Sequence, residues 1–160
     1  MSTSTNHPAD DILFFDFEEE FVEDLRCIPM IVRFKLDTCG IKLKLAEWNQ
    51  FSEEEREQFT FQPCTSEDEI EDYREFLKDL IFMYTETDAA EIPVEEHPPW
   101  LDTAVIPPAL VEKAQTHEVE ISLQQWQGLS PLQRFALIKL SRPSHENKNF
   151  LPALQEFQLL

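Results

Sequence analysis

The amino-acid sequence predicts a mainly α-helical fold, arranged as a single compact domain of two tandem-related helical units with short extended pieces. A 32-residue stretch, 28–59, recurs without a gap 78 residues later, at 106–137. Only two glycines, Gly40 and Gly128, occur among the 160 residues, which argues against a hairpin-rich β architecture. Both copies also carry serine residues at positions typical of helix starts.

The repeat preserves a packing pattern. Eight of its 32 aligned positions are identical, where chance gives about two. Conservative apolar pairs such as Ile41/Val119 and Phe59/Leu137 keep the same period. We therefore interpret the chain as an internal duplication. The identical pairs are Ile28/Ile106, Pro29/Pro107, Lys35/Lys113, Thr38/Thr116, Leu45/Leu123, Trp48/Trp126, Ser52/Ser130 and Arg56/Arg134.

The first unit, 28–84, begins with a predicted helix. Pro29 suits the first turn of a helix, because the N–H that proline lacks would be unpaired there. Gly40 is placed to end that helix in the left-handed conformation. Residues 41–45 alternate between apolar and polar, which indicates a short extended piece before Trp48, an expected core anchor.

Two capped helices follow in the first unit. A serine followed three residues later by a glutamate can form a capping box, in which each side chain accepts from the other residue's backbone N–H. Two such pairs predict helices near 53–61 and 67–84. They are Ser52 with Glu55 and Ser66 with Glu69.

Residues 85–105 form a proline-rich acidic connector in which we expect no regular element. We expect Trp100 to pack this connector onto the domain. The second unit, 106–160, repeats the signals: two prolines open its first helix, 119–121 alternates, and Ser130 caps the next helix.

The net charge and the lack of targeting signals bear on the partners and the location that we expect for this protein. The formal net charge of -19 would repel phosphate backbones, so nucleic acid is an unexpected partner. Residues 1–10 are small and polar and are expected to be disordered, and they have no signal-peptide pattern. The chain also has no apolar run long enough to cross a membrane, so we expect a cytoplasmic protein with 11–160 as its one domain.

Cations gather in two clusters, a first at 26–44 and a second at 134–148, and both overlap the repeat. Within the exposed loop predicted at 141–149, five side chains can donate hydrogen bonds, which suits a carboxylate or the acidic edge of a partner. Alternatively, the cations neutralise acidic segments of the same molecule, and the loop's polar residues only turn the chain. The candidate partner-binding residues are Arg33, Lys35, Lys42, Lys44, Arg134, Arg142, His145, Asn147, Lys148 and Asn149.

Catalytic and metal-binding patterns are weak. No nucleophile-elbow, zincin, P-loop or dinucleotide-binding motif occurs. The three cysteines, Cys27, Cys39 and Cys64, are an odd number without C-x-x-C spacing. We therefore expect no catalytic residue, no bound metal and no cofactor.

Continuous strings in this chain resemble the nitrate reductase-associated protein family of cyanobacteria from about Phe14 onward. They are FVEDLRCIPMIVRFKLDTCGIKLKLAEWNQFS, the Pro-Trp-Leu-Asp of the connector, and PLQRFALIKLSRPSHENKNFLPALQEF. The resemblance implies a cytoplasmic accessory factor for the maturation or activity of assimilatory nitrate reductase, a molybdenum and iron-sulfur enzyme. The strings 33–40 and 145–150 are the candidate recognition surface.

The preferred hypothesis is therefore an accessory or maturation factor, a non-enzymatic monomer that contacts nitrate reductase directly. The alternative is a metal or cofactor carrier for that enzyme with Cys27, Cys39 and Cys64 as ligands. A third hypothesis is an enzyme that uses Cys39 and His145. DNA binding is the least favoured, because the charge contradicts it.

Overall fold

The computed structural model describes residues 14–18, 25, 27–143 and 148–160. These ranges contain eight α-helices, two 3-10 turns and one two-stranded sheet, which confirms the mainly helical prediction. The chain divides into two compact units, Met1–Val94 and Glu95–Leu160. The single-domain organisation and the connector boundaries stay predictions, and residues 1–10 lie outside the described ranges.

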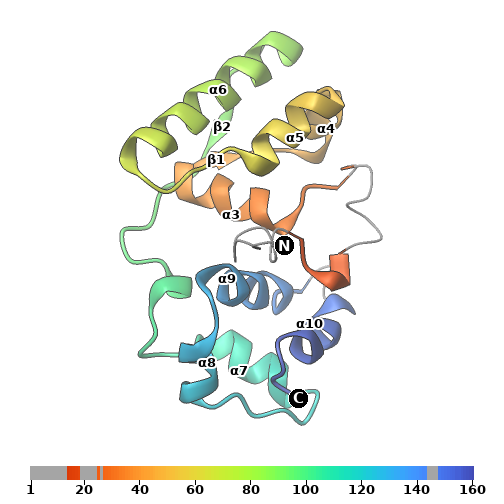
Figure 1. Cartoon of the computed structure of the whole chain (residues 1–160), viewed down its shortest axis with the longest axis vertical. Helices are drawn as coiled ribbons and strands as arrows, with labels where there is room; N and C mark the ends of the chain where they lie inside the picture. Colours follow the sequence, from red (N-terminus) through yellow and green to blue (C-terminus); the bar gives the residue numbers. More distant parts are fainter. Residues whose placement is uncertain (1–13, 19–24, 26, 144–147) are drawn as a thin grey trace, which may run out of the picture. The chain divides into compact units, whose positions relative to one another are not determined.

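Unit 1 contains four α-helices in its described residues, and α6 is the longest (Figure 1). The strands β1 and β2 form a short antiparallel sheet, in which Ile41 is opposite Glu91 and Lys42 is opposite Ala90. The elements in order are η1 (Asp16–Glu18), α3 (Met30–Cys39), β1 (Ile41–Lys42), α4 (Leu45–Gln50), α5 (Glu53–Phe61), α6 (Glu67–Thr85) and β2 (Ala90–Glu91).

Local signals place the helices of unit 1 as predicted. Both expected capping boxes form, at Ser52 and at Ser66. Gly40 ends α3 in the left-handed conformation, with φ of 80°. The core is then built from the apolar faces of these helices, with an aromatic cluster at its centre. That cluster contains Trp48, Phe51, Phe59 and Tyr73.

The start of α3 is capped from a distant part of the chain. Pro29 is the residue before α3 and provides no side-chain cap. Instead the Glu18 carboxylate, only 2% exposed, accepts from the backbone N–H of Met30 at 3.0 Å and from that of Phe15 at 3.1 Å. A carboxylate is favoured at a helix N-terminus, where the peptide dipoles leave positive charge. Glu18 thus ties η1 to the first turn of α3.

Unit 2 is built around α9. Seven of the ten residues of α9 are buried, and Trp100 of η2 packs edge-on against Phe135 with ring centroids 5.0 Å apart. The predicted packing role of Trp100 is therefore confirmed within this unit. The elements in order are η2 (Pro99–Leu101), α7 (Pro108–Gln115), α8 (Leu123–Gly128), α9 (Pro131–Leu140) and α10 (Phe150–Glu156).

The extended pieces differ from the prediction in two respects. The predicted connector does hold short regular elements: β2 lies before Pro93, and η2 begins at Pro99, because proline is tolerated in the first turn of a helix. The alternating pattern at 119–121 gives alternating burial but no strand; β1, in contrast, has β2 as its partner. None of the described helices has both the length and the apolar character needed to cross a membrane.

Candidate partner-binding residues

Lys42 and Lys44 are the exposed cations that the structure describes in the first cluster, 26–44. Lys42 lies on β1, and Lys44 is the residue before α4, where its backbone N–H donates to Glu47 Oε1 at 2.8 Å. Arg33 is half-buried on α3, and its Nε donates to the Ile28 carbonyl oxygen at 3.2 Å. The two lysines are therefore the members of this cluster that a partner could contact most directly.

Lys35 has a structural position instead. Its side chain is 9% exposed, and Nζ donates to the carbonyl oxygens of Thr60 and Gln62, both at 2.7 Å. These carbonyls belong to the C-terminal end of α5, where a cation interacts favourably with the helix dipole. Burial lowers the pKa of Lys35 to about 8, while the nearby Cys64 acts in the opposite direction.

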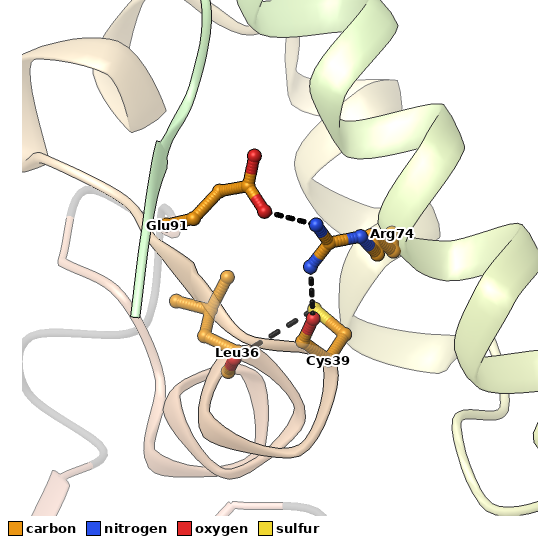
Figure 2. Close-up of polar contacts among 4 residues, drawn as sticks. All are labelled: Leu36, Cys39, Arg74 and Glu91. Carbon is orange, nitrogen blue, oxygen red and sulfur yellow. Dashed lines mark hydrogen bonds and ion pairs between the residues drawn. The ribbon is translucent and has the colours of Figure 1, made fainter. Parts of the chain in front are cut away.

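Arg74 holds the end of α3 beside β2. Figure 2 shows its guanidinium between two groups: Nη1 donates to the Cys39 carbonyl oxygen at 2.8 Å, and Nη2 pairs with the Glu91 carboxylate. Gly40 lies at the same place, and an added Cβ there would come within 2.8 Å of Val94 Cγ2 and 3.0 Å of the Ile92 carbonyl oxygen. The string 33–40 therefore ends in a tightly packed corner of unit 1.

Arg134, in the second cluster, is also enclosed by its own unit. Its side chain is 5% exposed and donates to three backbone carbonyl oxygens: Trp100 at 2.7 Å, Leu129 at 2.6 Å and Trp126 at 3.3 Å. Burial lowers the pKa of Arg134. The guanidinium thus holds η2, α8 and the start of α9 together within unit 2.

The rest of the second cluster lies around the loop after α9. Arg142 and Lys148 are exposed, and Asn149 is the half-buried residue before α10. His145 and Asn147 lie outside the described residues. The first cluster belongs to unit 1 and this one to unit 2, so each is described by itself.

The cysteines differ in burial. All three are free thiols, with Cys27 half-buried and the other two buried. Burial raises the pKa of Cys39 to about 11 and that of Cys64 to about 12. Nucleophilic attack requires a thiolate, and such pKa values disfavour it for these two thiols at neutral pH. The described residues also contain no group of three or more histidine, cysteine or acidic side chains arranged to hold a metal.

Comparison with known proteins identifies the family. Residues 14–157 match the model of the conserved nitrate reductase-associated protein family. The chain belongs to this family. The family description names an associated protein and not the reductase itself. The search of curated proteins and the search of solved structures each find no match.

Side-chain hydrogen bonds of both tryptophans of the repeat were not identified from the sequence. Trp48 Nε1 and Arg56 Nη1 both donate to the Leu25 carbonyl oxygen, at 2.6 and 3.0 Å. In unit 2, Trp126 Nε1 donates to the Asp102 carbonyl oxygen at 2.9 Å. The signal that could have revealed them was the repeat, because Trp48/Trp126 and Arg56/Arg134 are identical pairs.

Proposed function

We propose that this protein is an accessory or maturation factor that supports assimilatory nitrate reductase by direct protein–protein contact. The observation that carries the proposal is the family match over residues 14–157. The contact surfaces are the exposed cations Lys42 and Lys44 in unit 1, and Arg142 and Lys148 in unit 2. Arg33 in unit 1 and Asn149 in unit 2 are further candidates for these surfaces, while His145 and Asn147, outside the described residues, stay predictions.

Lys35 and Arg134 are excluded from these surfaces. Both are buried, and each already donates to carbonyl oxygens of its own unit. Removing either cation from those carbonyls would leave buried acceptors without their donors, which costs free energy. The proposed contacts therefore use only cations that reach solvent.

Charge distribution supports a selective contact. The chain carries 32 acidic and 13 basic residues, so exposed pairs of cations are local exceptions on an acidic protein. Complementary charge across an interface raises the association rate and selects the partner more than it raises affinity. The partner surfaces would be acidic patches of nitrate reductase, and the remaining acidic surface of this protein would repel other acidic proteins.

We also propose that the two units arose by internal duplication, so that the protein carries two related helical modules. Shifting unit 1 by 78 residues superimposes the bounds of α4 on those of α8, and the start of α5 on that of α9. Gly40 and Glu118, which this shift also aligns, both have positive φ, of 80° and 60°. These matches support a common origin for the modules.

The test is co-elution with nitrate reductase prepared without its cofactors and, separately, with the finished enzyme. Three charge-reversed variants are compared with the unmodified protein: Lys42→Glu/Lys44→Glu, Arg142→Glu/Lys148→Glu, and the control Lys78→Glu/Lys113→Glu. The control changes charge equally at half-buried cations outside both clusters. We expect retention by the cofactor-free enzyme, loss of retention in the first two variants, and normal retention of the control.

Other outcomes separate the parts of the proposal. Retention only by the finished enzyme would replace a maturation role with that of an accessory subunit. Equal loss in all three variants would show that total charge matters and not these surfaces. No retention by either form of the enzyme would overturn the proposed function.

A further inference from the structure

The outer face of α5 in unit 1 combines a solvent-exposed aromatic ring with carboxylates. Phe61 is 63% exposed, the highest value among the large apolar side chains that stand exposed in the described residues. It lines a shallow hollow that is largely open to solvent, together with Glu54, Glu57, Gln58 and Gln62. Positions 54, 57, 58 and 61 follow the spacing of one helix face, so the hollow lies along a single side of α5.

The carboxylates in this hollow are not used by the rest of the described chain. The side-chain carboxylates of Glu54 and Glu57 are exposed, and neither has a hydrogen bond or ion pair with a residue that the structure describes. The Gln58 side chain donates from Nε2 to Gln62 Oε1 at 3.4 Å. An exposed aromatic ring beside two unpaired anions matches a cation with an apolar stem, since cations are attracted to aromatic faces and to carboxylates alike.

The matching face of α9 shows what this side of the helix can contact. The 78-residue shift aligns Glu57 with Phe135 and Phe61 with Lys139. In α9 the two positions form a cation–π contact, with Lys139 Nζ 5.2 Å from the centroid of the Phe135 ring. The α9 face is thus covered and supplies its own cation, whereas the α5 face offers an aromatic ring and anions without one.

We propose that this face of α5 is a docking surface for a basic segment of a partner protein, one that carries arginine or lysine together with apolar residues. A cationic head would lie over Phe61 and between the carboxylates of Glu54 and Glu57. Apolar residues of the segment would cover the rest of the Phe61 ring. This surface shares no residue with the exposed cations assigned to the reductase contact and is opposite in charge, so it does not rest on that assignment.

The test uses a defined probe, the peptide acetyl-Arg-Leu-Arg-Arg-Leu-Arg-amide, titrated into the isotopically labelled full-length protein at low salt. Amide chemical shifts report which residues respond, and the titration gives the dissociation constant. We expect the largest shifts at residues 54–62. Phe61→Ala and Glu54→Gln/Glu57→Gln should each raise the dissociation constant about fivefold.

A matched control keeps the result specific. Glu75→Gln/Asp79→Asn removes the same two charges from exposed positions of α6 that do not line the hollow, and it should change the dissociation constant less than twofold. Phe61→Leu keeps apolar bulk but removes the ring, so it distinguishes a cation–π contact from simple burial. Chemical shifts outside 54–62 should match the unmodified protein, which verifies that each variant is folded.

Three results would overturn the proposal. One is equal weakening by the α5 and α6 charge pairs, which would indicate general attraction to an acidic protein. Another is a set of shifts centred elsewhere in the chain. The third is the absence of any chemical-shift change at the highest peptide concentration of the titration.

Discussion

α5 and α9 begin with the same signals and are buried to very different extents. Both follow a short helix that contains a fully buried tryptophan, both start from a serine capping box, and both carry an arginine at the fourth helical position. Yet two of nine residues are buried in α5 and seven of ten in α9. Capping residues therefore determine where a helix lies in the sequence, while the residues on its faces determine what it contacts.

Arg56 and Arg134, each at the fourth position of its helix, show the same contrast in their hydrogen bonds. Arg134 donates to three backbone carbonyls. Arg56 donates to one, that of Leu25, and its buried Nε has no hydrogen-bond partner among the described residues. The arginine therefore binds three backbone carbonyls in unit 2 but only one in unit 1.

The largest expected effect tests that difference. Arg134→Met should lower the free energy of unfolding by about 3 kcal/mol, because it leaves buried carbonyls without a charged donor. Arg56→Met should cost about 1 kcal/mol, since only one hydrogen bond is lost. Urea denaturation monitored by circular dichroism measures both changes. Similar losses in the two variants would mean that the number of carbonyl contacts does not set the contribution of this arginine.

A second pair compares Gly40 with Glu118, which occupy left-handed backbone positions 78 residues apart. Gly40→Ala should cost about 2 kcal/mol, because φ is 80° and the new Cβ would meet Val94 and the backbone of Ile92. Glu118→Gly should raise the free energy of unfolding by roughly 0.5 kcal/mol, since glycine adopts a backbone φ of 60° without the steric strain of a side chain. Thermal unfolding checks both signs, and a destabilised Glu118→Gly would show that this side chain makes a contribution larger than its backbone strain.

A third pair uses pH to compare Lys35 with its aligned counterpart Lys113. Because burial lowers the pKa of Lys35 from 10.5 to about 8, the unfolded chain binds more protons than the folded chain between those values. The cost of burying this charge is fully present below pH 8 and is relieved as the pH rises. Relative to Lys35→Met, the unmodified protein should gain roughly 1 kcal/mol of stability between pH 7 and pH 9.

Lys113→Met is the control for that pH effect. Lys113 is half-buried on α7, and Lys113→Met removes the same charge from the aligned position, so the difference between the two variants isolates the effect of burial at position 35. Urea denaturation at pH 7, 8 and 9 provides the comparison. Equal pH dependence of stability in the unmodified protein and in Lys35→Met would contradict a lowered pKa of Lys35.

The sequence was sufficient to predict helices whose ends have local causes. Serine capping boxes placed α5 and α6, and Gly40 placed the end of α3. It was insufficient for β2 and for the cap on α3, because both depend on partners distant in sequence. β2 exists by pairing with β1, and the carboxylate of Glu18 reaches Met30 across twelve residues.

The candidate binding residues were predictable as a class but not one by one. Sequence clustering groups Lys35 with Lys42, although one is buried against α5 and the other is exposed. Periodicity does not reveal which cations cap neighbouring helices, since that depends on how the helices pack. Identity between the repeats was the better guide, because Lys35 and Arg134 belong to identical pairs whereas Lys42 and Lys44 do not.

The burial of Trp48 has a practical consequence for spectroscopy. Trp48 is the one tryptophan of residues 1–94. Its indole is fully buried, and Nε1 donates a hydrogen bond to the Leu25 carbonyl oxygen. The other two tryptophans, Trp100 and Trp126, belong to unit 2. In the Trp100→Phe/Trp126→Phe variant, the red shift of Trp48 fluorescence emission would therefore report the unfolding of unit 1 alone, without any attached dye.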